Sequence, residues 1–347
     1  MAIMRAARLH KIGEKLHLDN VPLPTLDCED VLIDIKASGI CHSDINYRNG
    51  VSPVGKLPIT LGHEIAGVIT EVGRKVHDVE KGDRVCVHYV LSCGGCRFCL
   101  MGKENLCERY KMVGKDVDGG FAEYIKVPAK NIVKLPPSIP FEQGAIIGCA
   151  VSTAFHALRR GKVKVGETVT IYGVGGVGVH AVQLASKVFG AGKVIAVDIS
   201  EEKLRIAKRV GADEIINAIE EKPSKRVKEI TDGKLSDVVL DFVGSKTTIE
   251  EAINCIGKGG RLLVVGISSE RATVSPYKDI IGKEMEIIGV NDHLRSEMIQ
   301  LIELVKLGKI NLSNSITHRV PLEEVNFGME ILEKKIGNPI KVVVIQE

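Results

Sequence analysis

The chain has 347 residues, of which 44% are hydrophobic, and a formal net charge of +3. This length usually exceeds what one hydrophobic core supports, so we expect two domains. The small charge leaves no basic tract for nucleic acid, no apolar run approaches the roughly 18 residues of a membrane span, and residues 1–10 lack the apolar core of a signal peptide. We therefore expect a cytoplasmic protein without a nucleic-acid or membrane partner.

Short alternating apolar runs, separated by turns rich in Gly and Pro, fill the first 150 residues. This pattern predicts β-strands. The predicted strands are Val31–Ala37, Ile65–Val72, Arg84–His88 and Ala122–Val127. A mainly β domain is the expected outcome for this part of the chain.

Within that part, four cysteines occur at the spacing Cys-x2-Cys-x2-Cys-x7-Cys, namely Cys93, Cys96, Cys99 and Cys107. The spacing lets one loop place four thiolates around a tetrahedral zinc. Two disulfides or an accidental cluster of thiols are the alternatives. The total of nine cysteines is odd, and a chain without a secretory signal is typical of compartments where disulfides rarely persist. Because four thiolates leave no position for substrate, we expect this zinc to be structural.

From about Ser152, predicted strands and helices alternate. The strands are Thr168–Tyr172, Lys193–Asp198, Asp237–Phe242, Arg261–Gly266 and Met285–Gly289, and the helices are Val177–Phe189, Glu201–Val210 and Thr247–Ile256. We expect Ser200 to be the N-cap of the second helix. The alternation predicts an α/β fold with a doubly wound parallel sheet that carries helices on both faces. After it we expect a helix at Ser296–Leu307, a short segment Ile310–Val320, a helix near Glu323–Lys334 and a strand at Lys341–Gln346.

A glycine-rich motif G-x-G-x-x-G, Gly173-Val174-Gly175-Gly176-Val177-Gly178, lies between the first strand and helix of this alternation. Its candidate cofactor-binding residues are Gly173, Gly175, Gly176, Val177 and Gly178. In this context the motif predicts a dinucleotide site, with the pyrophosphate at the helix N-terminus. The next strand ends in Asp198, whose carboxylate would accept the ribose hydroxyls and repel a 2′-phosphate. NAD is therefore favoured over NADP. A flavodoxin-like or methyltransferase-like nucleotide fold is the alternative.

Two further segments carry a family resemblance. Residues Ala37–Asn46 read Ala-Ser-Gly-Ile-Cys-His-Ser-Asp-Ile-Asn, and Gly62–Gly67 read Gly-His-Glu-Ile-Ala-Gly. Together with the four-cysteine loop and the glycine-rich motif, they resemble the zinc-dependent medium-chain alcohol dehydrogenases over essentially the whole chain. The resemblance implies a Rossmann NAD-binding domain at residues 151–290 and a GroES-like catalytic, zinc-binding domain at residues 1–150 and 291–347.

The resemblance also implies a catalytic zinc, and hence two zinc ions per subunit. Its ligands would be Cys41, His63 and Cys149, with the fourth position left for water or alcohol and Glu64 as a temporary ligand that exchanges with water. Taken alone, Cys149 would be a buried core thiol and His63 a structural histidine. The assignment depends on their joint occurrence with the other motifs.

Three polar residues receive roles from the same resemblance. Asp44 would orient His63, Ser43 would take the proton of the alcohol, and Thr153 would belong to the nicotinamide pocket. The chain departs from the family at Asn46, where many relatives have the histidine that ends the proton relay. An amide cannot titrate, so we expect the relay to end elsewhere.

Three basic residues would join the glycine-rich loop and Asp198 in binding the cofactor: Lys203, His42 and Lys341. His42 and Lys341 stand where other members place an arginine against the pyrophosphate. Neither side chain offers the two-pronged guanidinium, so the resemblance implies weaker cofactor affinity.

The expected function is reversible NAD-dependent oxidation of primary or secondary alcohols to aldehydes or ketones. Relatives that act on polyols, sugars or threonine usually carry a glutamate where Cys149 stands, and they remain the alternative. A zinc-free quinone reductase would lack the ligands. A non-catalytic zinc module for nucleic acid would need a basic, aromatic-rich face, whereas only 4% of the residues are aromatic. Tyr89 and Phe121 fit either the substrate pocket or the core.

Two expectations concern assembly and source. The chain between Cys107 and Cys149 is similar in length to that of tetrameric family members, so the resemblance implies a homotetramer. Abundant Lys, Glu and Ile, scarce Gln and absent Trp favour a thermophilic source.

Overall fold

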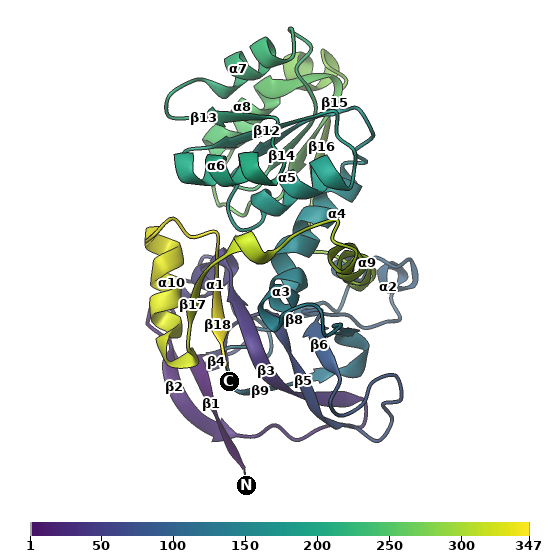
Figure 1. Cartoon of the computed structure of the whole chain (residues 1–347), viewed down its shortest axis with the longest axis vertical. Coiled ribbons are helices and arrows are strands. Elements are labelled where there is room, and N and C mark those ends of the chain that lie inside the picture. The colour runs from purple at the N-terminus through teal and green to yellow at the C-terminus, as the bar shows by residue number, and fades with distance from the viewer. Residues whose placement is uncertain (1, 347) are drawn as a thin grey trace. The chain divides into compact units, whose positions relative to one another are not determined.

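The protein, described here by a computed structural model of residues 2–346, divides into two compact units (Figure 1). Unit 1 contains the chain up to Ser152 and again from Asp292 onward, and unit 2 is Thr153–Asn291. Each unit has its own cluster of buried apolar side chains.

The main sheet of unit 1 has seven strands in the order β10-β6-β5-β3-β18-β17, with β9 also paired to β3. Their bounds are β3 Asp30–Ile40, β5 Glu64–Val72, β6 Arg84–Val87, β9 Tyr124–Pro128, β10 Ile132–Lys134, β17 Ile316–Val320 and β18 Lys341–Ile345. The long strand β3 is antiparallel to β5, β9 and β18, whereas β17 and β18 run parallel. Residues at positions 30–40 and 341–345, far apart in sequence, are therefore neighbours.

Smaller elements complete unit 1. The strands β1 Ile3–Leu9, β2 His17–Pro22 and β4 Ile59–Thr60 form a three-stranded sheet, and β7 Val90–Leu91 pairs with β8 Lys111–Met112. The helices are α1 His42–Arg48, α2 Arg97–Leu100, α3 Phe141–Ile146, α9 Arg295–Lys306 and α10 Val325–Lys334, with a π-helix η3 at Ile147–Val151 and short 3-10 turns η1 Glu104–Leu106, η2 Ala129–Asn131, η5 Ser313–Ser315 and η6 Leu322–Glu324. Helix α4 Ser152–Arg160 begins at the last residue of the first segment of unit 1.

Unit 2 is a parallel sheet in the order β13-β12-β11-β14-β15-β16. The strands are β11 Thr168–Tyr172, β12 Lys193–Asp198, β13 Glu214–Asn217, β14 Ser236–Asp241, β15 Ile256–Val264 and β16 Glu286–Gly289. The helices are α5 Gly178–Lys187, α6 Glu201–Val210, α7 Pro223–Ile230 and α8 Lys246–Cys255, with a π-helix η4 at Pro276–Ile281. The pair α5 and α6 and the pair α7 and α8 cover opposite faces of the sheet (Figure 1). The strand order reverses between β11 and β14, which is where doubly wound sheets bind ligands.

The predicted fold class is confirmed, and several element bounds agree with the structure. Strands β11 and β12 and helix α6 have the predicted bounds, because buried β-branched runs and an amphipathic helix give strong periodic signals. Ser200 occupies the N-cap of α6, but its side chain makes no capping hydrogen bond. Its backbone N–H donates instead to Asp198, at 3.0 Å.

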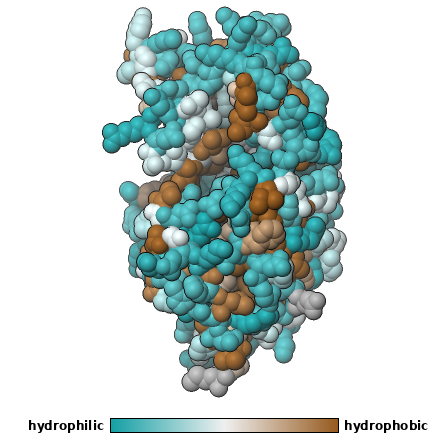
Figure 2. Space-filling model, turned by 90° about the vertical axis from the view of Figure 1, so that its left-hand side faces the viewer, coloured by the Kyte–Doolittle hydropathy of each residue, from teal (hydrophilic) through white to brown (hydrophobic). Residues whose placement is uncertain are grey.

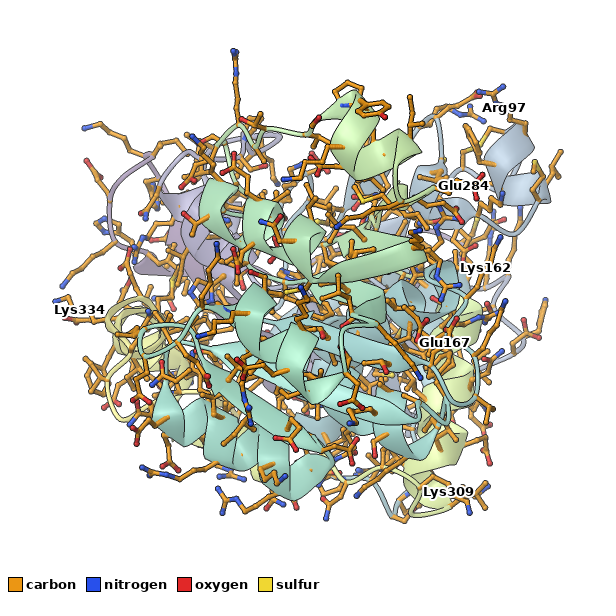
Figure 3. The ribbon with its side chains drawn as sticks, turned by 90° about the horizontal axis from the view of Figure 1, so that it is seen from above. Arg97, Lys162, Glu167, Glu284, Lys309 and Lys334 are labelled. Atoms are coloured by element: carbon orange, nitrogen blue, oxygen red, sulfur yellow. The ribbon has the colours of Figure 1, made fainter. Side chains whose placement is uncertain are left out.

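Charged side chains cover the outside of both units. Figure 3 shows Arg97, Lys309 and Lys334 pointing away from the ribbon. Figure 2 shows one face on which hydrophilic residues predominate and hydrophobic ones form small groups. Among residues 2–346, no helix combines the length and the apolar composition needed to cross a membrane.

Two glycines of the same motif have opposite steric environments, which generates a prediction. A Cβ on Gly178 would lie 2.0 Å from the carbonyl oxygen of Gly173, whereas a Cβ on Gly175 would meet nothing closer than the Lys203 amine at 3.8 Å. Alanine normally stabilises a helix relative to glycine, but here the backbone clash dominates. We expect Gly178→Ala to lower the free energy of unfolding by about 1–3 kcal/mol, and Gly175→Ala to leave it nearly unchanged. Denaturant unfolding of both variants measures this, and equal stabilities would contradict it.

Candidate metal centres and dinucleotide loop

The four cysteines of the loop lie together in the structure. Their ligand atoms are all within 4.8 Å of one another, and all nine cysteines of the chain have free thiols. The sulfur–sulfur distances are 3.5 Å for Cys96 and Cys99, 3.9 Å for Cys93 and Cys99, and 4.0 Å for Cys96 and Cys107. A tetrahedral zinc with Zn–S bonds of about 2.3 Å requires an edge of about 3.8 Å. The loop therefore fits zinc and not a pair of disulfides.

Backbone N–H groups stabilise negative charge on these sulfurs. The N–H of Cys96 donates to Cys93 Sγ at 3.3 Å, and the N–H groups of Cys93 and Arg109 donate to Cys107 Sγ at 3.2 and 3.4 Å. Hydrogen bonds from the backbone of Gly95 and Cys96 lower the pKa of Cys93 to about 5. A thiolate is thus available to a metal at neutral pH.

A second group of donors converges in the interior of unit 1. Cys41 follows the end of β3, Glu64 opens β5 directly after His63, and Cys149 lies in the π-helix. One ligand atom from each of these four residues lies within 4.8 Å of the others. His63 and Glu64 have no exposed surface, and Cys149 is 7% exposed. The structure thus brings together all four predicted donors, which are 108 positions apart at the extremes.

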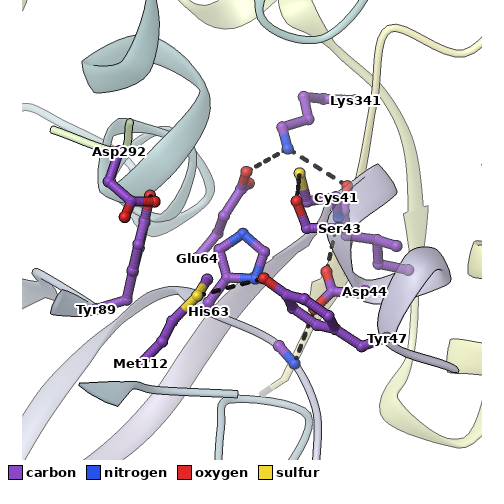
Figure 4. A network of polar contacts seen from close by, with 12 residues as sticks. Cys41, Ser43, Asp44, Tyr47, His63, Glu64, Tyr89, Met112, Asp292 and Lys341 are labelled. Carbon is purple, nitrogen blue, oxygen red and sulfur yellow. Dashed lines mark hydrogen bonds and ion pairs between the residues drawn. The ribbon is translucent and has the colours of Figure 1, made fainter. Parts of the chain in front are cut away.

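Asp44 fixes both Cys41 and His63. Its Oδ2 accepts from the Cys41 N–H at 2.9 Å, as part of a capping box at the start of α1, and its Oδ1 lies 3.2 Å from His63 Nδ1 (Figure 4). Burial lowers the pKa of His63, but the charge and hydrogen bond of Asp44 outweigh it and raise that pKa well above its usual range. Nδ1 is thereby oriented toward Asp44. The other ring nitrogen, Nε2, is buried and has no hydrogen-bond partner among the described residues, as expected of an atom that faces a metal.

The two thiols share their protons unequally. A hydrogen bond from Cys149 lowers the pKa of Cys41 well below its usual range despite burial, and Lys341 acts in the same direction. The same hydrogen bond and burial raise the pKa of Cys149 well above its usual range. The Cys41 thiol therefore ionises more readily than that of Cys149, and a bound cation would favour ionisation of both.

Lys341, predicted to bind the cofactor, lies buried beside Glu64 in the structure. It lies at the start of β18, is 3% exposed, and forms an ion pair with Glu64 through its amine, which also donates to the Ile40 carbonyl at 3.4 Å. Burial raises the pKa of Glu64 to about 7, although Lys341 opposes this effect. The close approach requires Gly39, where a Cβ would lie 2.0 Å from Glu64 Oε2. The expected contact of Lys341 with a pyrophosphate stays a prediction.

Helix α1 carries three further predicted residues, His42, Ser43 and Asn46. Ser43 Oγ is 3.7 Å from Cys41 Sγ, close enough to face an atom bound at the same centre. His42 is exposed, and Asn46 is partly buried, with its carbonyl accepting from the Val51 N–H at 2.9 Å. The hydroxyl and the imidazole thus sit on consecutive residues at the helix start.

Tyr89 and Phe121 are both buried, at 2% and 0% exposure. Phe121 is part of the apolar core, where it lies against Gly62. The Tyr89 ring meets the His63 ring edge-to-face at 5.1 Å, and its hydroxyl donates to Asp292 at 2.9 Å. Asp292 and the following His293 were not predicted from the sequence, because no spacing or motif links them to residues some 200 positions earlier.

The glycine-rich turn lies in unit 2, between β11 and α5. Gly173 has φ of +80°, a left-handed conformation that favours glycine. Asp198 accepts three backbone N–H groups, from Val174 at 2.9 Å, Ile199 at 2.8 Å and Ser200 at 3.0 Å. A carboxylate has about four lone-pair sites, so one remains for a ligand.

The open side of Gly175 faces the Lys203 amine and has room for a ligand. Gly176 and Val177, both partly buried, lie in the turn between Gly175 and helix α5, and Gly178 begins α5. Thr153, the first residue of unit 2, is partly buried in α4. The loop, Asp198 and Lys203 therefore offer backbone N–H groups, a carboxylate and an amine suited to a dinucleotide phosphate and ribose.

Comparison with known proteins agrees with this geometry. Residues 27–137 match the family described as alcohol dehydrogenase GroES-like domain, and residues 176–306 match zinc-binding dehydrogenase. The chain belongs to the zinc-dependent medium-chain alcohol dehydrogenase family. It is therefore an enzyme of the zinc- and NAD(P)-dependent dehydrogenases, with the GroES-like and Rossmann-like domains of that family.

Three relatives illustrate the range of this family. The chain is 36% identical to the NAD-dependent alcohol dehydrogenase of Sulfurisphaera tokodaii, over 98% of this chain and 100% of the relative. It is 35% identical to L-threonine 3-dehydrogenase of Bacillus licheniformis, over 98% of each. The crystal structure of a zinc-binding dehydrogenase from Sinorhizobium meliloti 1021 bound to NADP is 29% identical, covers 100% of both chains, and has a TM-score of 0.92.

Proposed function

We propose that the protein catalyses the reversible NAD-dependent oxidation of primary or secondary alcohols to aldehydes or ketones. The observation that carries this proposal is the buried cluster of Cys41, His63 and Cys149, with the orphaned Nε2 of His63 directed into it. Two thiolates and one imidazole are a ligand set of catalytic zinc sites that keep one position open. Residues 1–150 and 291–347 would then form the catalytic domain and residues 151–290 the NAD-binding domain.

We further propose two zinc ions per subunit. The four-cysteine loop would hold a structural zinc, since its four sulfurs complete a tetrahedron. The buried cluster would hold the catalytic one, with Glu64 in reach as a temporary ligand. When bound, this zinc acts as a Lewis acid that lowers the pKa of an alcohol, and NAD accepts the hydride.

The protein's own residues supply positioning and proton transfer. Asp44 holds the imidazole of His63 in one orientation, and Lys341 compensates the charge of Glu64. Ser43 would take the proton of the alcohol, because its hydroxyl lies beside Cys41 Sγ. Solvent or the exposed His42 would receive the proton next, since Asn46 cannot accept it. Thr153 would contact the nicotinamide.

The proposal of simple alcohols, and not polyols, sugars or threonine, as substrates rests on one residue. The third ligand position carries Cys149, whereas the polyol and threonine enzymes implied by the family resemblance usually have glutamate there. The similarity to a threonine 3-dehydrogenase makes this alternative the one to test.

An activity panel tests the proposed function. The purified protein should reduce NAD when simple primary or secondary alcohols are added, and NADH absorbance measures this. Polyols or threonine should give only weak reduction. Ser43→Ala should reduce turnover by roughly 100-fold while NAD still binds, because it removes a proton-transfer group. Asn46→His should keep similar turnover and add a titration near the imidazole pKa. A preference for threonine, or full activity of Ser43→Ala, would contradict the proposal.

Cofactor choice is proposed to depend on Asp198. Its carboxylate should favour NAD over NADP by roughly 2–4 kcal/mol, a hydrogen bond gained against a charge repulsion. The related Sinorhizobium meliloti dehydrogenase structure contains NADP, so cofactor choice has to be measured for this chain. Because Asp198 also holds the turn through Val174, Asp198→Asn is the informative variant: it keeps an acceptor and removes the charge. The ratio of kcat/KM for the two cofactors should shift toward NADP in this variant, and further toward NADP in Asp198→Gly with Ile199→Arg. Equal use of both cofactors by the parent enzyme would refute the proposal.

We also propose a homotetramer in which unit 2 sheets pair edge to edge. Strand β16 is an edge of the sheet, and it carries exposed Ile287, with exposed Tyr277 and Ile281 just before it. An unpaired apolar edge strand is a template for a second copy related by a two-fold axis.

Light scattering of the parent protein should give about four times 37.6 kDa. Ile287→Glu should break the pairing between the two unit 2 sheets and lower the measured mass, because two like charges would meet across the two-fold axis. Ile219→Glu, which alters an exposed isoleucine next to the opposite edge strand, is the matched control and should leave the mass unchanged. A monomeric parent at micromolar concentration would contradict this assembly.

A further inference from the structure

We propose that Asp292 and His293 position two of the zinc ligands, one through a tyrosine ring and one through a backbone carbonyl. The inference rests on the catalytic zinc site proposed above. Both residues belong to unit 1, at the point where the chain returns to it after unit 2. They are adjacent in sequence, so one short segment would control both ligands.

Asp292 anchors two tyrosines. The hydroxyl of Tyr89 donates to its Oδ1 at 2.9 Å, and the hydroxyl of Tyr110 donates to its Oδ2 at 2.8 Å. Burial and the Asp292 charge raise the pKa of both tyrosines, so both stay protonated and can only donate to the carboxylate. Asp292 itself has φ of +51°, a conformation that costs energy outside glycine and is held here by these contacts.

The first ligand is reached through Tyr89. Its ring meets the imidazole of His63 edge-to-face, with a centroid distance of 5.1 Å and an interplanar angle of 78° (Figure 4). Tyr89 is 2% exposed, and its hydrogen bond to Asp292 sets the orientation of the ring within this buried space. Asp44 holds one nitrogen of His63 and Tyr89 limits the tilt of its ring, which together fix the direction of Nε2.

The second ligand is reached through Gly148. The Nε2–H of His293 donates to the Gly148 carbonyl at 2.7 Å, immediately before Cys149 in the π-helix. His293 has no exposed surface, and burial lowers its pKa, so the neutral ring donates from Nε2. His88 in turn donates from Nε2 to the His293 carbonyl at 3.2 Å. The π-helix turn that carries Cys149 is thus fixed from outside by a buried donor.

The segment is also tied to the four-cysteine loop. Tyr110 lies three residues after Cys107, and the carboxylate of Glu104, inside the loop, accepts the N–H of Arg295 at 2.8 Å. The Arg295 guanidinium donates to the Ile132 carbonyl at 2.7 Å. These contacts hold the segment rigid, as a positioning role requires.

The test measures zinc affinity at each site of the full-length protein by chelator competition, together with the visible spectrum after Co²⁺ substitution. Tyr89→Phe keeps the ring and removes its anchor, and His293→Ala removes the donor to Gly148. Each should weaken the catalytic zinc by about 10–100-fold, the usual effect of losing an outer partner. Each should also shift the cobalt bands of that site and leave the four-cysteine zinc unchanged.

Two further variants separate positioning from general stability. His293→Gln places an amide N–H near the position of Nε2, so it should restore most of the affinity that His293→Ala loses. Tyr110→Phe removes the other hydroxyl on Asp292 but leaves Tyr89 anchored, so it should have a smaller effect than Tyr89→Phe. If His293→Ala does not fold, Tyr89→Phe and His293→Gln still decide the question.

The outcomes for this inference and for the proposed function are distinct. If the parent protein binds one zinc and Cys149→Ser does not change that binding, the proposed catalytic zinc site is refuted. A parent that binds two zinc ions, with Tyr89→Phe and the His293 variants retaining parental affinity and an unchanged cobalt spectrum, would overturn the positioning role alone.

Discussion

The structure of unit 1 depends on one electrostatic constraint, the burial of four potentially anionic or metal-binding side chains at one point. Cys41, Glu64 and Cys149 converge with His63 within 4.8 Å, and within this group Lys341 supplies the countercharge to Glu64. Removing such groups from water costs several kcal/mol per ion unless they are paired. A dication held by Cys41, His63 and Cys149 would satisfy the thiolates and the orphaned imidazole nitrogen at once, and Asp44 already orients two of these ligands.

Strand pairing provides that geometry. The antiparallel register of β3 and β5 places Gly39 opposite Glu64, and β18 brings Lys341 alongside β3 from the far end of the sequence. A register shift of one residue would turn these side chains to the other face of the sheet. The precision of the site is therefore largely a property of the sheet, because Glu64 and Lys341 lie in its strands and Cys41 and His63 directly adjoin them.

Features that depend on local sequence were predictable. The four-cysteine loop and the glycine-rich turn are set by short spacings, and β11, β12 and α6 are set by strong periodicity. Strands β1 and β2 and helix α7 were not predicted, because their apolar patterns are short and interrupted by charged residues. The convergence of Cys41, His63 and Cys149 came from family resemblance, since no local rule connects them.

Contacts between residues far apart in the chain could not be predicted from the sequence. Lys341 was expected at a pyrophosphate, and nothing near it indicates that its amine pairs with Glu64, 277 positions earlier. Asp292 and His293 form no motif, yet they contact residues 203 and 145 positions away. Such pairs are created by tertiary packing, and a single sequence records no periodicity for them.

The proposed chemistry requires that each chain hold two zinc centres with different ligand sets. Zinc X-ray absorption spectroscopy on the purified parent protein tests it directly, because the spectrum counts sulfur neighbours. With four thiolates at one centre and two at the other, we expect two zinc ions per chain and an average of about three sulfurs and one lighter atom around each. A single zinc per chain surrounded by about four sulfurs would contradict it.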